Sequence, residues 1–282
     1  MMQKKVLKNI IHYNDCWFRN CFYQQLVAAY GAFGIPADYV VCNYTIDIDF
    51  SDDNETLDIR EHEILDEDEF SALTGICQKR VRFEDVCKQL CTAVRSGNPV
   101  ILGADSFYLP TRTQYYNQKH APHYLLVYEF DLKRKMFTVG ENDGIAIFHF
   151  TEKEVPFDVI EQTYHSFEER FASPDSAVQL EIAKKCPLYL RADALNKLKK
   201  DFCERNYIQY VSFYRMLLEK SWTVEELSSW LEFAIKYTNF FRILMKQCSY
   251  MFGEPKKLNV LADIWHDALS SLEILKDAIR LG

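Results

Sequence analysis

The sequence is poor in glycine and proline, with only 9 Gly and 8 Pro among its 282 residues. A chain with so little of either residue is neither collagen-like nor a low-complexity disordered segment. Hydrophobic residues make up 48% of the chain, and 20 Phe and 17 Tyr are among them. We therefore expect a folded protein with a sizeable apolar core, large enough for one big domain or two modest ones.

Long apolar runs are also missing, so we expect no membrane-spanning segment and no membrane partner. The first twelve residues contain lysines, but they lack the long apolar region and the small-residue cleavage site of a signal peptide. The nine cysteines are an odd number without regular spacing. In a chain without a secretion signal, this predicts reduced thiols and a cytoplasmic location.

Several sequence signatures of enzymes are absent. The chain has no Gly-x-Ser-x-Gly elbow, no phosphate-binding glycine loop and no dinucleotide fingerprint, which argues against serine hydrolases, kinases and dehydrogenases. The seven histidines form no metal-type pair on a helix, so we expect no metal and no cofactor. A net charge of -8 argues against a nucleic-acid partner.

The hydrophobic pattern changes character between residues 167 and 175. Before this point, helices are predicted at 21–33, at 83–95 and from 152, and strands at 39–50, 99–105, 123–130, 136–140 and 145–150. After it, helices are predicted at 176–185, 192–219, 223–251 and 258–281. These patterns predict an α+β fold, with a helix packed on an antiparallel sheet in a first domain (1–170) and a helical bundle in a second domain (171–282).

The helix predicted at residues 21–33 begins with a cysteine. Asn20 is a good N-cap for it, because its side-chain oxygen can accept a hydrogen bond from a free amide of the first turn. A thiol at this position, Cys21, lies near the positive end of the helix dipole, which favours the thiolate. Cys16 is a rival nucleophile, because Asn14 or Asp15 could cap a helix that starts there.

A histidine and an acid follow this cysteine in the order found in papain-like enzymes. His123 stands at the start of a predicted strand, and Glu141 follows the next strand, with Asn142 and Asp143 close enough to take its place. In such a site the histidine accepts the proton of the cysteine, and the third residue orients the imidazole ring. The pattern therefore predicts Cys21, His123 and Glu141 as a catalytic set.

Four short motifs carry a family resemblance. They are Cys21 followed by Gly34-Ile35-Pro36, the strand Gly97-Asn98-Pro99-Val100-Ile101-Leu102, the strand His123-Tyr124-Leu125-Leu126-Val127 with Asp131 after it, and the segment Asp105-Ser106-Phe107-Tyr108-Leu109-Pro110. The first three resemble the double-glycine-leader peptidase-like enzymes of the papain-like superfamily. Within that superfamily the chain most resembles the butirosin-biosynthesis BtrH N-terminal-domain family, over roughly residues 12–165.

This resemblance implies a papain-like fold and acyl transfer in antibiotic or other secondary-metabolite biosynthesis. Cys21 would form an acyl-enzyme, His123 would move the proton and Glu141 would orient the ring. Asn14 and the Cys21 amide would hold the oxyanion, because Asp15 occupies the place of the glutamine that serves this purpose in the peptidases. Asp105, with the acidic stretch at 47–69, would receive a cationic amine.

The partners implied by the resemblance are an acyl- or peptidyl-carrier protein and an amine-bearing small molecule. The basic clusters at 133–135 and 197–200 are possible contacts for an acidic carrier protein. Two alternative functions stay open. The first is a cysteine peptidase or thioesterase, in which water is the acceptor. The second is a non-catalytic adaptor that keeps the fold and binds a partner through the helical bundle.

Overall fold

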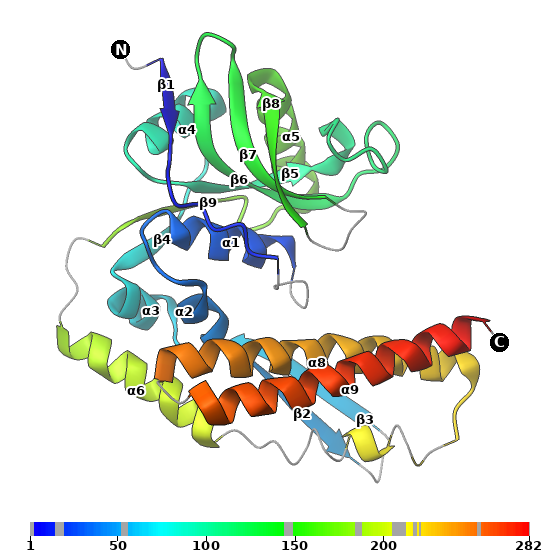
Figure 1. The fold of residues 1–282 in the computed structure, drawn as a ribbon. Coiled ribbons are helices and arrows are strands. Elements are labelled where there is room, and N and C mark those ends of the chain that lie inside the picture. The colour runs from blue at the N-terminus through cyan, green and yellow to red at the C-terminus, as the bar shows by residue number, and fades with distance from the viewer. Residues whose placement is uncertain are drawn as a thin grey trace. The chain divides into compact units, whose positions relative to one another are not determined.

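Figure 1 shows the fold in a computed structural model of the chain. The structure describes residues 3–14, 20–51, 56–143, 149–183, 188–204, 213–216, 219, 221–252 and 255–281. The chain divides into two compact units, the first made of residues 1–37 and 67–191 and the second of residues 38–66 and 192–282. Each unit is described by itself below. The domain boundary near residue 170 stays a prediction.

A seven-stranded antiparallel sheet forms the centre of the first unit (Figure 1). Its main path runs β4-β9-β5-β6-β7-β8, and β1 pairs with β6. The strands are β1 (Lys4–Val6), β4 (Ile76–Arg80), β5 (Val100–Asp105), β6 (Pro122–Asp131), β7 (Met136–Asp143), β8 (His149–Pro156) and β9 (Ala177–Ile182). All six residues of β5 are buried, which explains why this strand reads as a continuous apolar run.

Helices cover this sheet. They are α1 (Cys21–Gly31), α3 (Glu67–Thr74), α4 (Val86–Arg95) and α5 (Phe157–Phe171), with a short 3-10 turn η1 at Ser106–Tyr108. Helix α1 packs against β5, β6 and β7, while α4 and α5 pack against each other and against β5. The N-cap predicted for α1 is confirmed, because the Asn20 side chain accepts from the Tyr23 amide at 3.1 Å.

The turn between β6 and β7 has a clear local cause. The Asp131 side chain accepts from the amides of Lys133 and Arg134 at 2.9 and 3.1 Å, which closes an Asx-type turn. Lys135 then adopts a left-handed backbone with φ 52°. This turn sets the register next to it, where Asp131 pairs with Met136 and Phe130 with Phe137.

The second unit joins a β-hairpin to long helices. The hairpin consists of β2 (Tyr44–Ser51) and β3 (Thr56–Glu63), and the helices are α2 (Ala37–Cys42), α6 (Leu188–Glu204), α8 (Val224–Phe252) and α9 (Pro255–Leu281). Helices α8 and α9 pack along each other. Thr223 and Glu226 form a capping box at the start of α8, because the Thr223 hydroxyl accepts from the Glu226 amide and the Thr223 amide donates to the Glu226 carboxylate. Among the described residues, no helix has the length and apolar character needed to cross a membrane.

The structure confirms the predicted fold class, an antiparallel α+β sheet with packed helices followed by a helical C-terminal region. It corrects one element within that prediction. Residues 176–185 were expected to be helical, but Ala177–Ile182 form strand β9, which lies between β4 and β5. Burial alternates from Val178 to Glu181, as in a strand, and the paired residues of β5 and β4 lie about 75 to 105 positions away in sequence.

Two further predictions shift at their boundaries. The strand expected from residue 39 begins only at Tyr44, because Ala37–Cys42 form the short helix α2. The helix expected from residue 152 starts at Phe157, because β8 continues through Pro156 as it pairs with β7. In both places the pairing with a neighbouring strand decides where the element starts.

The close contact between β5 and α5 provides a stability test. A Cβ atom added at Gly103 would lie 2.5 Å from the Phe167 ring. Overpacking of this kind costs about 1–3 kcal/mol, so Gly103→Ala should lower the free energy of unfolding by that amount in urea denaturation. Because the clash is with the ring, the double variant Gly103→Ala/Phe167→Leu should lose less stability than the sum of the two single variants. Simple additivity would contradict this contact.

Candidate functional site

Cys21 is the first residue of α1, and its side chain is half-buried. The backbone N–H of Tyr124 on β6 and the Arg112 guanidinium both lie close enough to the thiol to favour its thiolate form. Burial nevertheless raises the pKa of Cys21, and the Tyr124 amide and the Arg112 guanidinium offset only part of this rise. The thiolate expected from the position at the helix start is therefore not the favoured form at neutral pH.

His123, one residue before Tyr124, is buried at the start of β6. Burial, together with the charge of Arg112, lowers the pKa of His123 to about 3, so the imidazole is neutral at physiological pH. Its Nε2 atom lies 3.7 Å from Glu141 Oε1, and the Glu141 side chain is 1% exposed. The structure thus brings His123 and Glu141 together, at a distance longer than an ordinary hydrogen bond.

Arg112 is part of this cluster, although the sequence pattern did not identify it. Its Nη1 atom donates to the backbone carbonyl of Asn142 at 2.6 Å, and its Nε atom lies 3.8 Å from Glu141 Oε1. The side chain of Asn142 faces α1, where its Oδ1 atom accepts from Gln25 Nε2 at 2.9 Å. The only sequence signal for Arg112 is that it is the one arginine in the tyrosine-rich segment between β5 and β6.

Three further residues were predicted to belong to the site, and the structure describes them to different extents. Asn14 is exposed, and its Oδ1 atom accepts from the Phe150 amide at 2.8 Å. Asp143 ends β7, but its side chain lies outside the described part of the structure. Cys16 also lies outside the described residues. The roles predicted for these residues stay predictions.

Asp105 belongs to a separate buried network at the end of β5. Its Oδ2 atom accepts from the Ser166 hydroxyl at 2.7 Å and lies 2.6 Å from His120 Nδ1, while its Oδ1 atom accepts from the Phe107 amide at 3.1 Å. Burial tends to raise the pKa of Asp105, but the hydrogen bonds from Ser166, His120 and Phe107 outweigh this effect and lower it. Side chains of the protein therefore enclose the Asp105 carboxylate. The role predicted for Asp105, binding of a substrate amine, stays a prediction.

The acidic stretch at 47–69 also finds basic partners within the chain. Glu61 accepts from Lys236 Nζ and from the Tyr237 hydroxyl, both at 2.8 Å, in the second unit. In the first unit, Glu67 forms an ion pair with Arg80. Part of the negative charge of this acidic stretch is thus neutralised by basic residues of the chain itself. Within the described ranges, no group of three or more His, Cys, Asp or Glu side chains could hold a metal ion.

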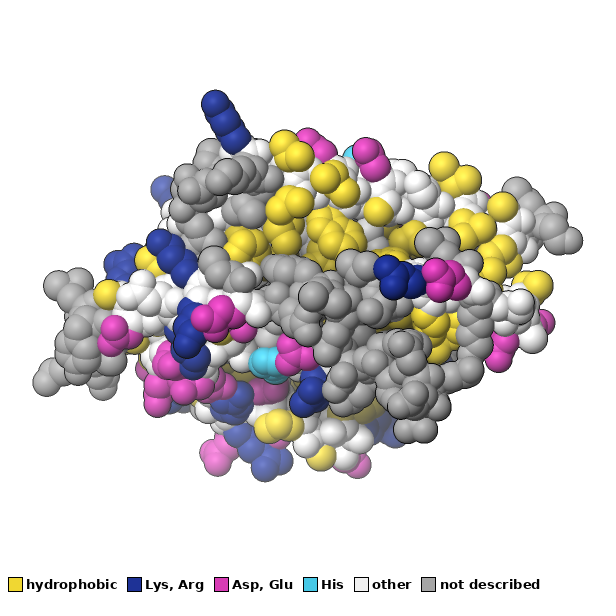
Figure 2. Space-filling view, turned by 90° about the horizontal axis from the view of Figure 1, so that it is seen from below, with side chains coloured by type: hydrophobic (Ala, Val, Ile, Leu, Met, Phe, Trp, Pro, Cys, Tyr) yellow, Lys and Arg dark blue, Asp and Glu magenta, His cyan; other side chains and the backbone are white. Residues whose placement is uncertain are grey.

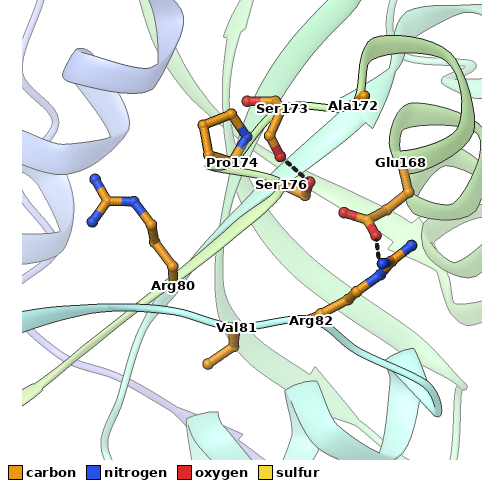
Figure 3. A pocket seen from close by; sticks show the side chains of 8 residues that line it. All are labelled: Arg80, Val81, Arg82, Glu168, Ala172, Ser173, Pro174 and Ser176. Carbon is orange, nitrogen blue, oxygen red and sulfur yellow. Dashed lines mark hydrogen bonds and ion pairs between the residues drawn. The ribbon is translucent and has the colours of Figure 1, made fainter.

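A pocket of about 410 Å³ opens in the first unit (Figure 3). It is lined by Arg80, Val81, Arg82, Glu168, Ala172, Ser173, Pro174 and Ser176. Its two arginines already bind carboxylates: Arg82 Nε lies 2.6 Å from Glu168, and Arg80 binds Glu67 and Asp175. Cys21, His123 and Glu141 do not line this pocket, so it adds nothing to the candidate site.

Comparison with known protein families identifies the family to which this chain belongs. Residues 8–178, more than half of the sequence, match the family described as the DUF1839 N-terminal domain. The chain belongs to the DUF1839 N-terminal domain family. The DUF1839 match includes Cys21, Arg112, His123 and Glu141, and it ends before the helical C-terminal region. No curated protein matches the chain.

The protonation of Cys21 can be measured directly. Because burial raises its pKa, we expect its alkylation by iodoacetamide to be slow at pH 7 and to accelerate as the pH rises above 9. Peptide-resolved mass spectrometry between pH 6 and 10 would follow this thiol among the nine, with Cys21→Ser identifying its peptide. Fast labelling that stays constant down to pH 6 would instead indicate a thiolate at rest.

The Asp105 network predicts a pH-dependent stability. A lowered pKa in the folded state means that this carboxylate stabilises the fold above about pH 4 and that the stabilisation is lost as the pH falls through the folded pKa. Asp105→Asn should therefore lower the free energy of unfolding by about 1–3 kcal/mol at pH 7, and by less at pH 3. Urea denaturation at both pH values tests this, with the exposed Asp193→Asn as the control. A loss that is equal at both pH values would contradict it.

Proposed function

We propose that the protein is a cysteine-dependent acyltransferase that uses Cys21 as its nucleophile, on a papain-like arrangement of helix and sheet. The observation that carries this proposal is the cluster at the start of β6. The amide of Tyr124 lies close enough to the Cys21 thiol to lower its pKa, and the preceding residue, His123, has its Nε2 atom 3.7 Å from Glu141 Oε1. Membership in the DUF1839 N-terminal domain family is compatible with this activity and does not specify it.

The protons can be followed through two half-reactions. Because Nε2 of His123 faces Glu141, Nδ1 is the nitrogen that would take the Cys21 proton as the sulfur attacks the thioester carbonyl. The C–S bond of the donor breaks, its sulfur leaves as a thiolate that takes this proton from His123, and the acyl group stays on Cys21. An amine then attacks the acyl-enzyme and gives its proton to His123, which returns it to Cys21 as the amide is released.

A neutral imidazole and a neutral thiol at rest suit this sequence of steps. His123 can accept a proton only when it is neutral, and the low pKa of the buried ring keeps it so. Contacts between catalytic groups are often long before substrate binds and shorten in the reacting complex. This agrees with the 3.7 Å separation between His123 and Glu141.

The finer part of the proposal rests on the resemblance to the butirosin-biosynthesis BtrH family. The acyl or aminoacyl donor would be a carrier-protein thioester, the acceptor an amine-bearing small molecule, and the setting cytoplasmic secondary-metabolite biosynthesis. A peptidase or thioesterase would use the same Cys21 adduct, with water as the acceptor. The nature of the acceptor therefore separates these two activities.

A non-catalytic adaptor is the second candidate, and the complete burial of His123 favours it, because a ring with a pKa of about 3 is a weak base. The helical region offers a surface for such a role. Hydrophobic side chains gather on the face of the molecule seen in Figure 2. The exposed apolar side chains of α9 are Val260, Leu261, Ile264, Ile274 and Leu275.

One transfer experiment distinguishes these functions. An aminoacyl thioester of N-acetylcysteamine, used as the donor, should add one aminoacyl mass to the protein, and 1,3-diaminopropane should remove it much faster than water does. Cys21→Ser should abolish the adduct, and His123→Ala should slow its formation about 100-fold or more. Cys87→Ser, a change at a half-buried thiol on α4, serves as the control and should behave like the wild type.

Each outcome of that experiment assigns a function. Release by water at the same rate as by the amine would make the protein a thioesterase and overturn acyl transfer. A folded wild-type protein that forms no adduct on Cys21 would overturn the enzyme proposal and favour the adaptor.

A further inference from the structure

We propose that Arg112 is a positioning residue of the candidate site, whose guanidinium holds the end of β7, and with it the Glu141 carboxylate, beside the His123 imidazole. This inference rests on the proposed function, because it assigns a role within the same site. It is tested below by a measurement that needs no substrate.

The contacts of Arg112 carry the inference. Its side chain is 12% exposed, and Nη1 donates to the Asn142 carbonyl at 2.6 Å. A single carboxylate oxygen, Glu141 Oε1, lies 3.8 Å from Arg112 Nε and 3.7 Å from His123 Nε2. The guanidinium therefore contacts the backbone of β7 and the carboxylate that faces the imidazole at the same time.

Arg112 is itself held in place by a folded segment. Its amide donates to the Leu109 carbonyl at 2.9 Å, and its carbonyl accepts from the amides of Tyr115 and Tyr116 at 2.8 and 2.9 Å. The guanidinium also lies over the Tyr115 ring, 5.5 Å from its centre, where a cation is favoured. The irregular segment between β5 and β6 thus presents Arg112 to β7 with a fixed backbone.

Helix α1, which begins at Cys21, binds the same end of β7. Gln25, one turn after Cys21, donates from Nε2 to Asn142 Oδ1 at 2.9 Å. Gly140 allows this approach, because a Cβ atom there would lie 3.2 Å from Gln25 Oε1 and would collide with the Phe150 ring. Asn142 is therefore bound through its side chain by α1 and through its backbone by Arg112, and Glu141 lies directly before it.

The charge of Arg112 gives this role a measurable signature. The guanidinium lowers the pKa of the Cys21 thiol and also that of His123. The Glu141 carboxylate, which carries the opposite charge, lies 3.7 Å from His123 Nε2. Removal of the guanidinium should raise the pKa of Cys21, so that less thiolate is present at a given pH.

The test is the pH profile of Cys21 alkylation in the full chain, followed by peptide-resolved mass spectrometry. Arg112→Gln and Arg112→Met remove the charge, and Met keeps the apolar packing on Tyr115. In both variants we expect the profile to move to higher pH, with a rate at pH 8 about three- to tenfold below that of the wild type. Arg112→Lys keeps the charge and should restore most of the wild-type profile.

Arg134→Gln is the matched control, because Arg134 is exposed and pairs with Glu154 on β8. Its alkylation profile should coincide with that of the wild type. A folded Arg112→Gln or Arg112→Met protein with an unchanged profile would overturn the proposal. If neither variant folds, Arg112→Lys provides the test, because a lysine ammonium cannot span both Asn142 and Glu141. We then expect kcat for acyl transfer to fall at least tenfold with KM little changed. An unchanged kcat would overturn the proposal.

Failure of this inference can be told apart from failure of the proposed function. Alkylation of Cys21 requires no thioester and no amine, so the profile can shift in a protein that transfers no acyl group. Conversely, an active acyltransferase whose alkylation profile ignores Arg112 would keep the proposed function and discard the role of Arg112.

Discussion

The antiparallel pairing of β6 with three other strands is the constraint on which the candidate site depends. The first half of β6, Pro122–Val127, pairs with β5, and its second half pairs with β7 and, near its end, with β1. This places His123 opposite Ala104 of β5 and the amide of Tyr124 against the Cys21 thiol. Residues about 100 positions apart in sequence meet only because the sheet forms. A change that loosens β6 would therefore affect Cys21, His123 and Glu141 together.

Burial has a larger effect than local charge in setting the protonation of this site. A helix N-terminus stabilises a nearby negative charge by about 0.3–1 kcal/mol when it is exposed. Desolvation acts in the opposite direction on Cys21, and the net result is a raised pKa. The same desolvation lowers the pKa of His123 to about 3, and Arg112 adds to that effect. The site thus rests as a neutral thiol and a neutral imidazole, beside one ion pair formed by Arg112 and Glu141.

Local signals were sufficient for some elements and insufficient for others. Asn20 was predicted as the N-cap of α1 because that signal depends on contacts within a few residues. The turn at Asp131 and the capping box at Thr223 are equally local. Strand β9 depends on β4 and β5, which are distant in sequence, and the helical reading of residues 176–185 was wrong for that reason. Arg112 escaped prediction because an irregular segment has no periodicity that could tell which way a side chain points.

Composition, capping and the period of apolar residues are enough to predict the α+β class, the helix that begins at Cys21 and the elements that carry the cysteine, the histidine and the acid. Tertiary structure alone decided that Glu141 approaches His123, that Arg112 joins them, and that Asp105 is enclosed by Ser166 and His120. These contacts depend on strand register and on the removal of water from the groups that meet. Both are properties of the packed chain and are not encoded in any short stretch of it.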